Sequence, residues 1–128
     1  MIEKKKVGNF GERIAEQYLI QKGYKILDRN YFFKIPASPL RGEVDIVAKK
    51  ENTISFVEVK TLKNPSFLIS PEEKVNFSKQ RKIIQTAESW LMKNKVPLNS
   101  KWQIDVLAIE IKNGQVKISH FENAVSFS

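Results

Sequence analysis

Charged side chains interrupt two otherwise apolar stretches of the chain, Gly42–Ala48 and Phe56–Lys60. Burying a carboxylate or an ammonium in such a strand costs several kcal/mol per ion unless something compensates the charge. If the two stretches pair as neighbouring strands with their charged faces aligned, Asp45, Glu58 and Lys60 converge. A divalent cation would compensate the two carboxylates, and one or two carboxylates suffice to anchor Mg²⁺. The spacing therefore predicts a metal site for Mg²⁺, with Mn²⁺ as a substitute.

Side chains alternate between the two faces of a strand, and this divides each stretch. In the first stretch we expect one face to carry Glu43, Asp45 and Val47, and the opposite face to carry Val44, Ile46 and Ala48. In the second stretch we expect one face to carry Phe56, Glu58 and Lys60. Lys60 would then stand beside the attacking water or the scissile phosphate and offset developing negative charge. The structural alternative makes Glu43 a solvent-edge residue and the other three an ordinary ladder of ion pairs.

A third carboxylate is available from the first expected helix, Phe10–Lys22. Its apolar residues recur with helical spacing, and Gly23 is a plausible end. Glu12 lies one step from the apolar stripe, at the edge of the packed face. It is therefore a third metal-ligand candidate, although a single glutamate in such a position is more often a surface residue.

The remaining periodicities indicate an α/β fold in which helices pack against a mixed sheet, as a single domain over residues 1–128. A second helix is expected after either a capping-box pattern at Ser70–Glu73 or a later cap at Ser78. The Asn113-Gly114 pair is a strong hairpin signal. Loops are expected at Lys34–Arg41 and between Pro65 and Pro71. The expected strands are Tyr24–Phe33, Gly42–Lys49, Thr53–Thr61, Trp102–Ile111 and Gln115–Phe121.

The composition narrows the classes of function. The chain has 128 residues, 41% of them hydrophobic, a net charge of +8 and no cysteine, which excludes thiolate catalysis and cysteine-based zinc sites. No apolar run reaches the roughly 18 residues of a membrane span, so we expect a soluble, cytoplasmic protein without a membrane partner. Residues 74–101 hold seven basic side chains against Glu88 alone. Such a cluster fits a nucleic acid, although it also fits a solvated helix face.

Other polar residues have weaker signals. Near the expected helix start, the basic segment includes Lys79, Gln80, Arg81 and Lys82. Free N–H groups at a helix N-terminus already favour a phosphate. Asp105, flanked by apolar residues, would pair with a basic residue or support the site, and we favour a structural role. His120, the only histidine, is interpreted as structural too.

The spacing of several motifs carries a resemblance to a known family. These motifs are Gly11-Glu12, Ala15, Gly23-Tyr24, Arg29-Asn30, Gly42–Ala48, Phe56–Lys60 and Lys79. Together they resemble the YraN-like family of small bacterial proteins, which is placed with the restriction-endonuclease-like PD-(D/E)xK nucleases and is similar to archaeal Holliday-junction resolvases. The match covers about residues 8–123. Leu62 departs from the family, which usually has a basic residue there.

The resemblance implies a restriction-endonuclease-like fold, a central mixed β-sheet flanked by α-helices. It implies that Glu12, Asp45 and Glu58 coordinate metal and that Lys60 is the catalytic lysine. By analogy, Lys79 and Gln80 would reach the DNA backbone.

The function expected from these features is metal-dependent endonuclease hydrolysis of DNA phosphodiester bonds. A preference for branched or non-duplex DNA, and a homodimer, follow from the resemblance alone, and the charge pattern by itself does not separate DNA from RNA. The alternative is a non-catalytic nucleic-acid-binding module with the same fold. A scaffold for another protein is the third hypothesis.

Overall fold

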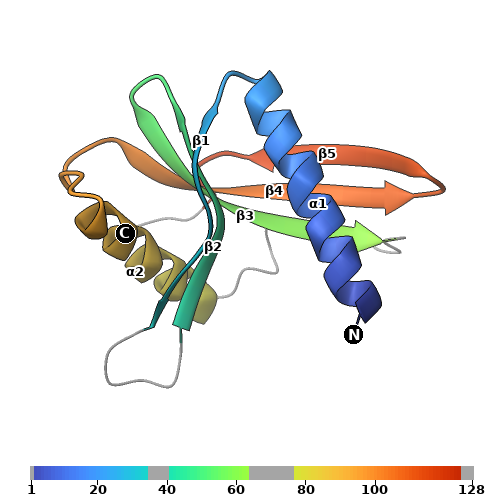
Figure 1. The fold of residues 1–128 in the computed structure, drawn as a ribbon, viewed down its shortest axis with the longest axis horizontal. Helices are drawn as coiled ribbons and strands as arrows, with labels where there is room; N and C mark the ends of the chain where they lie inside the picture. Colours follow the sequence, from blue (N-terminus) through green and yellow to red (C-terminus); the bar gives the residue numbers. More distant parts are fainter. Residues whose placement is uncertain (1, 35–40, 64–76, 125–128) are drawn as a thin grey trace.

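The computed structural model describes residues 2–34, 41–63 and 77–124. Helices lie on both sides of a single twisted sheet (Figure 1). The elements in chain order are α1 (Ile2–Gln21), β1 (Lys25–Lys34), β2 (Arg41–Lys50), β3 (Thr53–Lys63), α2 (Phe77–Lys93), β4 (Trp102–Lys112) and β5 (Gln115–Phe121). The expected α/β class with a mixed sheet is confirmed.

The sheet has the strand order β1-β2-β3-β4-β5. Among the described strands only the β3–β4 pair is parallel, and α2 lies in the crossover between these strands, as parallel pairing requires. The other neighbours are antiparallel. At the predicted hairpin between β4 and β5, Asn113 and Gly114 have φ of 52° and 76°, and positive φ at both central residues is typical of a type I′ turn.

The sheet divides into two arms where β2 and β3 separate. These strands pair only from Ile46↔Val57 to Lys50↔Thr53. Before that point β2 continues its pairing with β1 alone, and after it β3 continues with β4 to Lys63. Figure 1 shows the two arms running in different directions. We call this separation point, next to Asp45 on β2 and Glu58 on β3, the fork.

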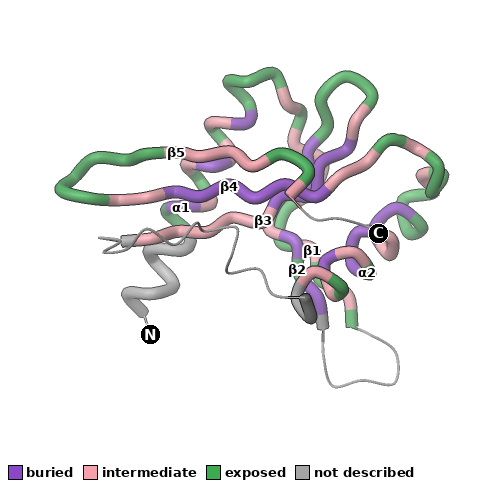
Figure 2. The backbone as a smooth tube through the Cα atoms, turned by 180° about the vertical axis from the view of Figure 1, so that it is seen from behind, coloured by how far each residue is buried: buried purple, intermediate pink, exposed green. Residues whose placement is uncertain are grey.

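Two hydrophobic clusters hold the helices to opposite faces of the sheet. Alternation along β3 separates them, because Phe56 belongs to the cluster of α2 and Val57 to the cluster of α1. The ring of Phe56 meets that of Trp90 on α2 edge to face, with centroids 5.7 Å apart. On the other face α1 buries Ala15 and Leu19 completely. Figure 2 shows the buried centre of β4 in purple, and its residues divide between the two clusters.

The expected strands match the observed ones to within two residues at each end. Helix α1 begins at Ile2, eight residues before the expected Phe10. The expected faces of β2 were wrong in part. Val44 and Val47 both pack in the cluster of α2, whereas Ile46 packs in that of α1. Strict alternation fails where the pairing of β2 with β3 ends.

Some expectations fall outside the described residues. These are the loop within Lys34–Arg41, the segment between Pro65 and Pro71, and the capping-box alternative at Ser70–Glu73. None of the helices in the described part of the chain is long and apolar enough to cross a membrane.

Candidate metal and phosphate site at the fork

Asp45 closes the fork from the side of β2. Its Oδ2 accepts a hydrogen bond from the backbone N–H of Val59 on β3, with an N···O distance of 2.8 Å. That N–H lies beyond the last β2–β3 ladder pair, so the carboxylate supplies the acceptor that β2 no longer offers. The carboxylate of Asp45 is thereby fixed against β3, between Glu58 and Lys60 in sequence.

Glu58 and Lys60 lie on the arm that β3 forms with β4. Their side chains are close together, with Lys60 Nζ 3.9 Å from Glu58 Oε1. The two side chains are mostly buried, 13% exposed for Glu58 and 24% for Lys60. Val57 and Val59, the residues that alternate with them, pack in the cluster of α1, as expected. The ammonium is therefore held next to a carboxylate at the edge of the fork.

Glu12 approaches Asp45 from α1. The helix can approach β3 because Gly11 packs directly on Thr61, where a Cβ would collide with the threonine hydroxyl. Glu12 and Asp45 both line a pocket of about 210 Å³ beneath α1. The full lining, which we call the fork pocket, is Asn9, Glu12, Arg13, Glu16, Arg29, Asn30, Asp45 and Ile46.

Negative charge is concentrated around Glu12. Burial is the largest cause that raises the pKa of Glu12, and the charges of Asp45 and Glu43 raise it further. Glu43 is exposed, and its charge acts on Glu12. A bound cation would relieve this repulsion, because a nearby positive charge favours the ionised carboxylates. The oxygen-rich donor set suits a hard cation such as Mg²⁺.

The structure does not bring the three predicted metal ligands to coordination spacing. Among the described residues, three potential ligand atoms lie within 4.8 Å of one another at Asp105, His120 and Glu122. Glu12, Asp45 and Glu58 form no such group within that part of the chain. The structure thus assembles Glu12 with Asp45 in one pocket and Glu58 with Lys60 in one ion pair.

Sequence reasoning assigned no role to the cationic residues of the fork pocket, although Arg29 belongs to a motif of the family resemblance. Arg13 follows Glu12 on α1, and Arg29 comes from β1. Arg29 forms a two-pronged ion pair with Glu16, in which Nε donates to Oε2 at 2.9 Å and Nη2 donates to Oε1. This interaction lowers the pKa of Glu16. Arg29 and Glu16 are 13 positions apart on different elements, so no helical or strand spacing relates them.

The predicted phosphate-binding residues of α2 lie on the other face of the sheet from α1. Gly42 of β2 packs against Lys82 and Thr86, which places this part of the helix beside the β1–β2 arm. Arg81 is exposed, and Gln80 and Lys82 are half-buried. The side chain of Lys79 lies outside the described part of the structure. This basic segment and the fork pocket therefore flank the same arm from opposite faces.

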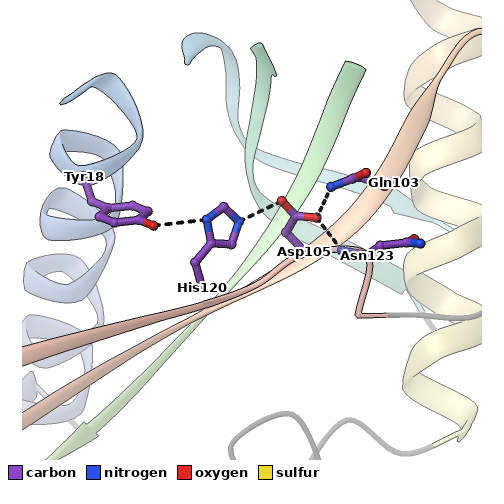
Figure 3. Close-up of polar contacts among 5 residues, drawn as sticks. All are labelled: Tyr18, Gln103, Asp105, His120 and Asn123. Carbon is purple, nitrogen blue, oxygen red and sulfur yellow. Dashed lines mark hydrogen bonds and ion pairs between the residues drawn. The ribbon is translucent and has the colours of Figure 1, made fainter. Parts of the chain in front are cut away.

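Asp105 is buried in a separate polar network (Figure 3). Its Oδ2 lies 2.8 Å from Nε2 of His120, whose Nδ1 lies 3.3 Å from the hydroxyl of Tyr18 on α1. Its Oδ1 accepts from the side chain of Gln103 and from the backbone N–H of Asn123, both at 2.9 Å. The network joins α1, β4 and β5, so its role is structural. The sequence could have indicated this pair only through one aspartate and one histidine placed on two adjacent predicted strands.

Negative charge also acts on the tyrosines near this network. Burial is the main cause that raises the pKa of Tyr24 to about 12, and Asp105 and Glu122 contribute. The pKa of Tyr18 is raised for the same reasons. At neutral pH both phenols keep their protons, as ordinary tyrosines also do.

Fold and site together define an α/β protein with a forked mixed sheet and an acidic pocket beneath its first helix. The chain belongs to the uncharacterised protein family UPF0102, whose profile it matches over residues 11–109. The resemblance to this family, the YraN-like one, is confirmed.

Curated relatives of nearly equal length support the family membership. The chain is 39% identical to the UPF0102 protein of Alkaliphilus oremlandii (strain OhILAs), over 94% of this chain and 97% of the relative. It is 43% identical to a UPF0102 protein of Clostridioides difficile (strain 630), over 94% and 96%. It is 36% identical to a UPF0102 protein of Vibrio parahaemolyticus, over 98% and 97%. Their names state no activity.

Proposed function

We propose that this protein is a metal-dependent endonuclease of the restriction-endonuclease-like PD-(D/E)xK type, acting on DNA in the cytoplasm. The observation that carries the proposal is the fork, where Asp45 is bonded to β3 between Glu58 and Lys60 and shares a pocket with Glu12. The fork pocket, with a volume of about 210 Å³, would receive the scissile phosphodiester beside these carboxylates. Branched or non-duplex DNA as substrate, and a homodimeric assembly, belong to this proposal through the family resemblance.

The donor chemistry at the fork fits Mg²⁺. Glu12, Asp45 and Glu58 would hold the cation, and the raised pKa of Glu12 supports the fit because a cation lowers the cost of crowded carboxylates. When bound, the cation supplies Lewis-acid stabilisation of the phosphoryl oxygens.

The chain's own residues orient the reacting groups. The hydrogen bond from Val59 orients the Asp45 carboxylate before substrate binds. Lys60, held 3.9 Å from Glu58, places an ammonium where negative charge develops on the phosphate. The basic residues Arg81 and Lys82 of α2 would bind flanking backbone phosphates without reading sequence.

A cleavage assay tests the proposal. Duplex, single-stranded, flap and four-way-junction DNA are incubated with purified protein and Mg²⁺ or Mn²⁺. We expect Glu58→Ala and Lys60→Ala to lose at least about 100-fold in cleavage rate, the range that one removed electrostatic or acid–base group costs. Binding of the same DNA should change little.

Glu110→Gln is the matched control. Glu110 lies on β4 opposite Lys117 of β5, in the hairpin and away from the fork, so its loss should leave cleavage unchanged. Cleavage that persists undiminished in Glu58→Ala and Lys60→Ala would contradict the assignment.

A non-catalytic nucleic-acid-binding module is the second candidate function. It is favoured by one observation, that Glu12, Asp45 and Glu58 are not gathered within 4.8 Å among the described residues. The same assay separates the two functions, because this module would bind DNA without cleaving any substrate in either metal.

A further inference from the structure

The ion pair between Arg29 and Glu16 lies in the fork pocket, beside the carboxylates of Glu12 and Asp45. A guanidinium binds a carboxylate and a phosphate with the same fork of parallel N–H groups. The guanidinium of Arg29 is therefore already oriented to bind two oxygen atoms. It lies in the pocket where the proposed function requires a phosphodiester.

The backbone that carries Arg29 is held firmly from the other side of the sheet. Arg29 donates its N–H to Oδ1 of Asp28 at 2.8 Å, and Oδ2 of Asp28 accepts from the indole of Trp90 on α2 at 3.0 Å. Asn30, the next residue, has φ of 51°, a conformation that asparagine tolerates better than most residues. Only the side chain of Arg29 is thus free to change partner.

The solvent exposure of the pair permits such an exchange. The side chain of Arg29 is 56% exposed and that of Glu16 is 25% exposed. Exposed ion pairs contribute about 0–1 kcal/mol to stability. Helix α1 is held to the sheet by Ala15 and Leu19, which are completely buried. The fold therefore needs the ion pair little, and releasing Arg29 from Glu16 costs little.

We propose that Arg29 binds a backbone phosphate of the nucleic acid beside Glu12 and Asp45, and that Glu16 competes with this phosphate by occupying the guanidinium in the free protein. The inference rests on the proposed function and adds a phosphate subsite with a built-in competitor. Glu16 then sets the affinity, because binding must displace it.

Two variants that break the same ion pair test this inference. Binding of a fluorescein-labelled four-way junction and of a duplex is measured with Ca²⁺ in place of Mg²⁺, over a series of KCl concentrations. Arg29→Ala should bind about 5- to 10-fold more weakly and lower the slope of log K against log [salt] by about 0.9, the value for one lost phosphate contact. Glu16→Gln should bind more tightly than the wild type, by a few-fold.

Lys112→Ala is the matched control, because it removes one exposed cation at the tip of the β4–β5 hairpin, away from the fork pocket. It should change the affinity less than 2-fold, and circular dichroism should show native folding for all three variants. If Arg29→Ala and Glu16→Gln weaken binding equally, or both leave it unchanged, the pair merely joins α1 to β1 and the inference is overturned while the proposed function stands. A wild type that binds neither probe overturns the proposed function itself.

Discussion

Two acidic regions lie under α1, and the surroundings of their carboxylates differ. In the Tyr18–His120–Asp105 network, the buried carboxylate of Asp105 has three hydrogen-bonding partners. In the fork pocket, Glu12 lies near Asp45 and Glu43, and burial together with their like charges raises its pKa. In the first region three hydrogen bonds satisfy one carboxylate, whereas in the second like charges act on Glu12 even though Arg29 pairs with Glu16.

The difference separates a structural site from a site that is ready for a ligand. A buried carboxylate with its acceptors satisfied stabilises one arrangement of the chain. Carboxylates that repel one another destabilise the folded state unless a cation binds, and such an arrangement is typical of functional sites. Removing a carboxylate should therefore lower the free energy of unfolding in the Asp105 network and raise it in the fork pocket.

Removing Asp105 should produce the largest effect. Asp105→Ala leaves the side chains of His120 and Gln103 and the N–H of Asn123 without their acceptor, and breaking a buried pair costs about 3–5 kcal/mol. Urea denaturation followed by circular dichroism measures the free energy of unfolding. Glu122→Gln, an exposed neighbour, should stay within about 0.5 kcal/mol of the wild type. A loss below about 1 kcal/mol in Asp105→Ala would remove the contrast between the two regions.

Shortening the network at its helix end should have a smaller effect. Tyr18→Phe removes the hydroxyl that lies 3.3 Å from Nδ1 of His120 and should cost about 0.5–1.5 kcal/mol. Tyr24→Phe is the matched control, because the ring of Tyr24 also lies beside His120, with centroids 6.2 Å apart. Equal losses in the two variants, measured by the same urea titration, would show that ring packing rather than the hydrogen bond joins α1 to β5.

Neutralising Glu12 should have the smallest effect and the opposite sign. The folded-state pKa of Glu12 is raised, so its ionised form destabilises the fold at neutral pH, and this cost disappears as pH falls below the unfolded value of 4.5. Glu12→Gln should therefore raise the free energy of unfolding at pH 7 by less than about 1 kcal/mol, because solvent screens a half-buried charge. At pH 4 the variant should unfold at the same urea concentration as the wild type. If Glu12→Gln instead lowers the free energy of unfolding at pH 7, the Glu12 carboxylate stabilises the fold, as that of Asp105 does.

Local sequence patterns predicted most of the fold. Alternation along Thr53–Thr61 predicted which side chains of β3 share a face, and Asn113-Gly114 predicted the hairpin, because both depend on the backbone of neighbouring residues. The motif spacing also predicted that Asp45 would meet β3 close to Glu58 and Lys60. The faces of β2 were predicted incorrectly near Asp45, where the pairing of β2 with β3 ends, and no local pattern marks that point.

The sequence by itself determined the element types, the mixed sheet and the residues that carry charge into apolar strands, since these follow from periodicity and composition. Only the tertiary structure decided that β2 and β3 separate at Asp45, that Arg29 meets Glu16, and that His120 meets Asp105 and Tyr18. Each of these contacts joins residues on different elements, 13 or more positions apart. Their distances depend on how helices and strands pack together, and no local pattern in the chain encodes that packing.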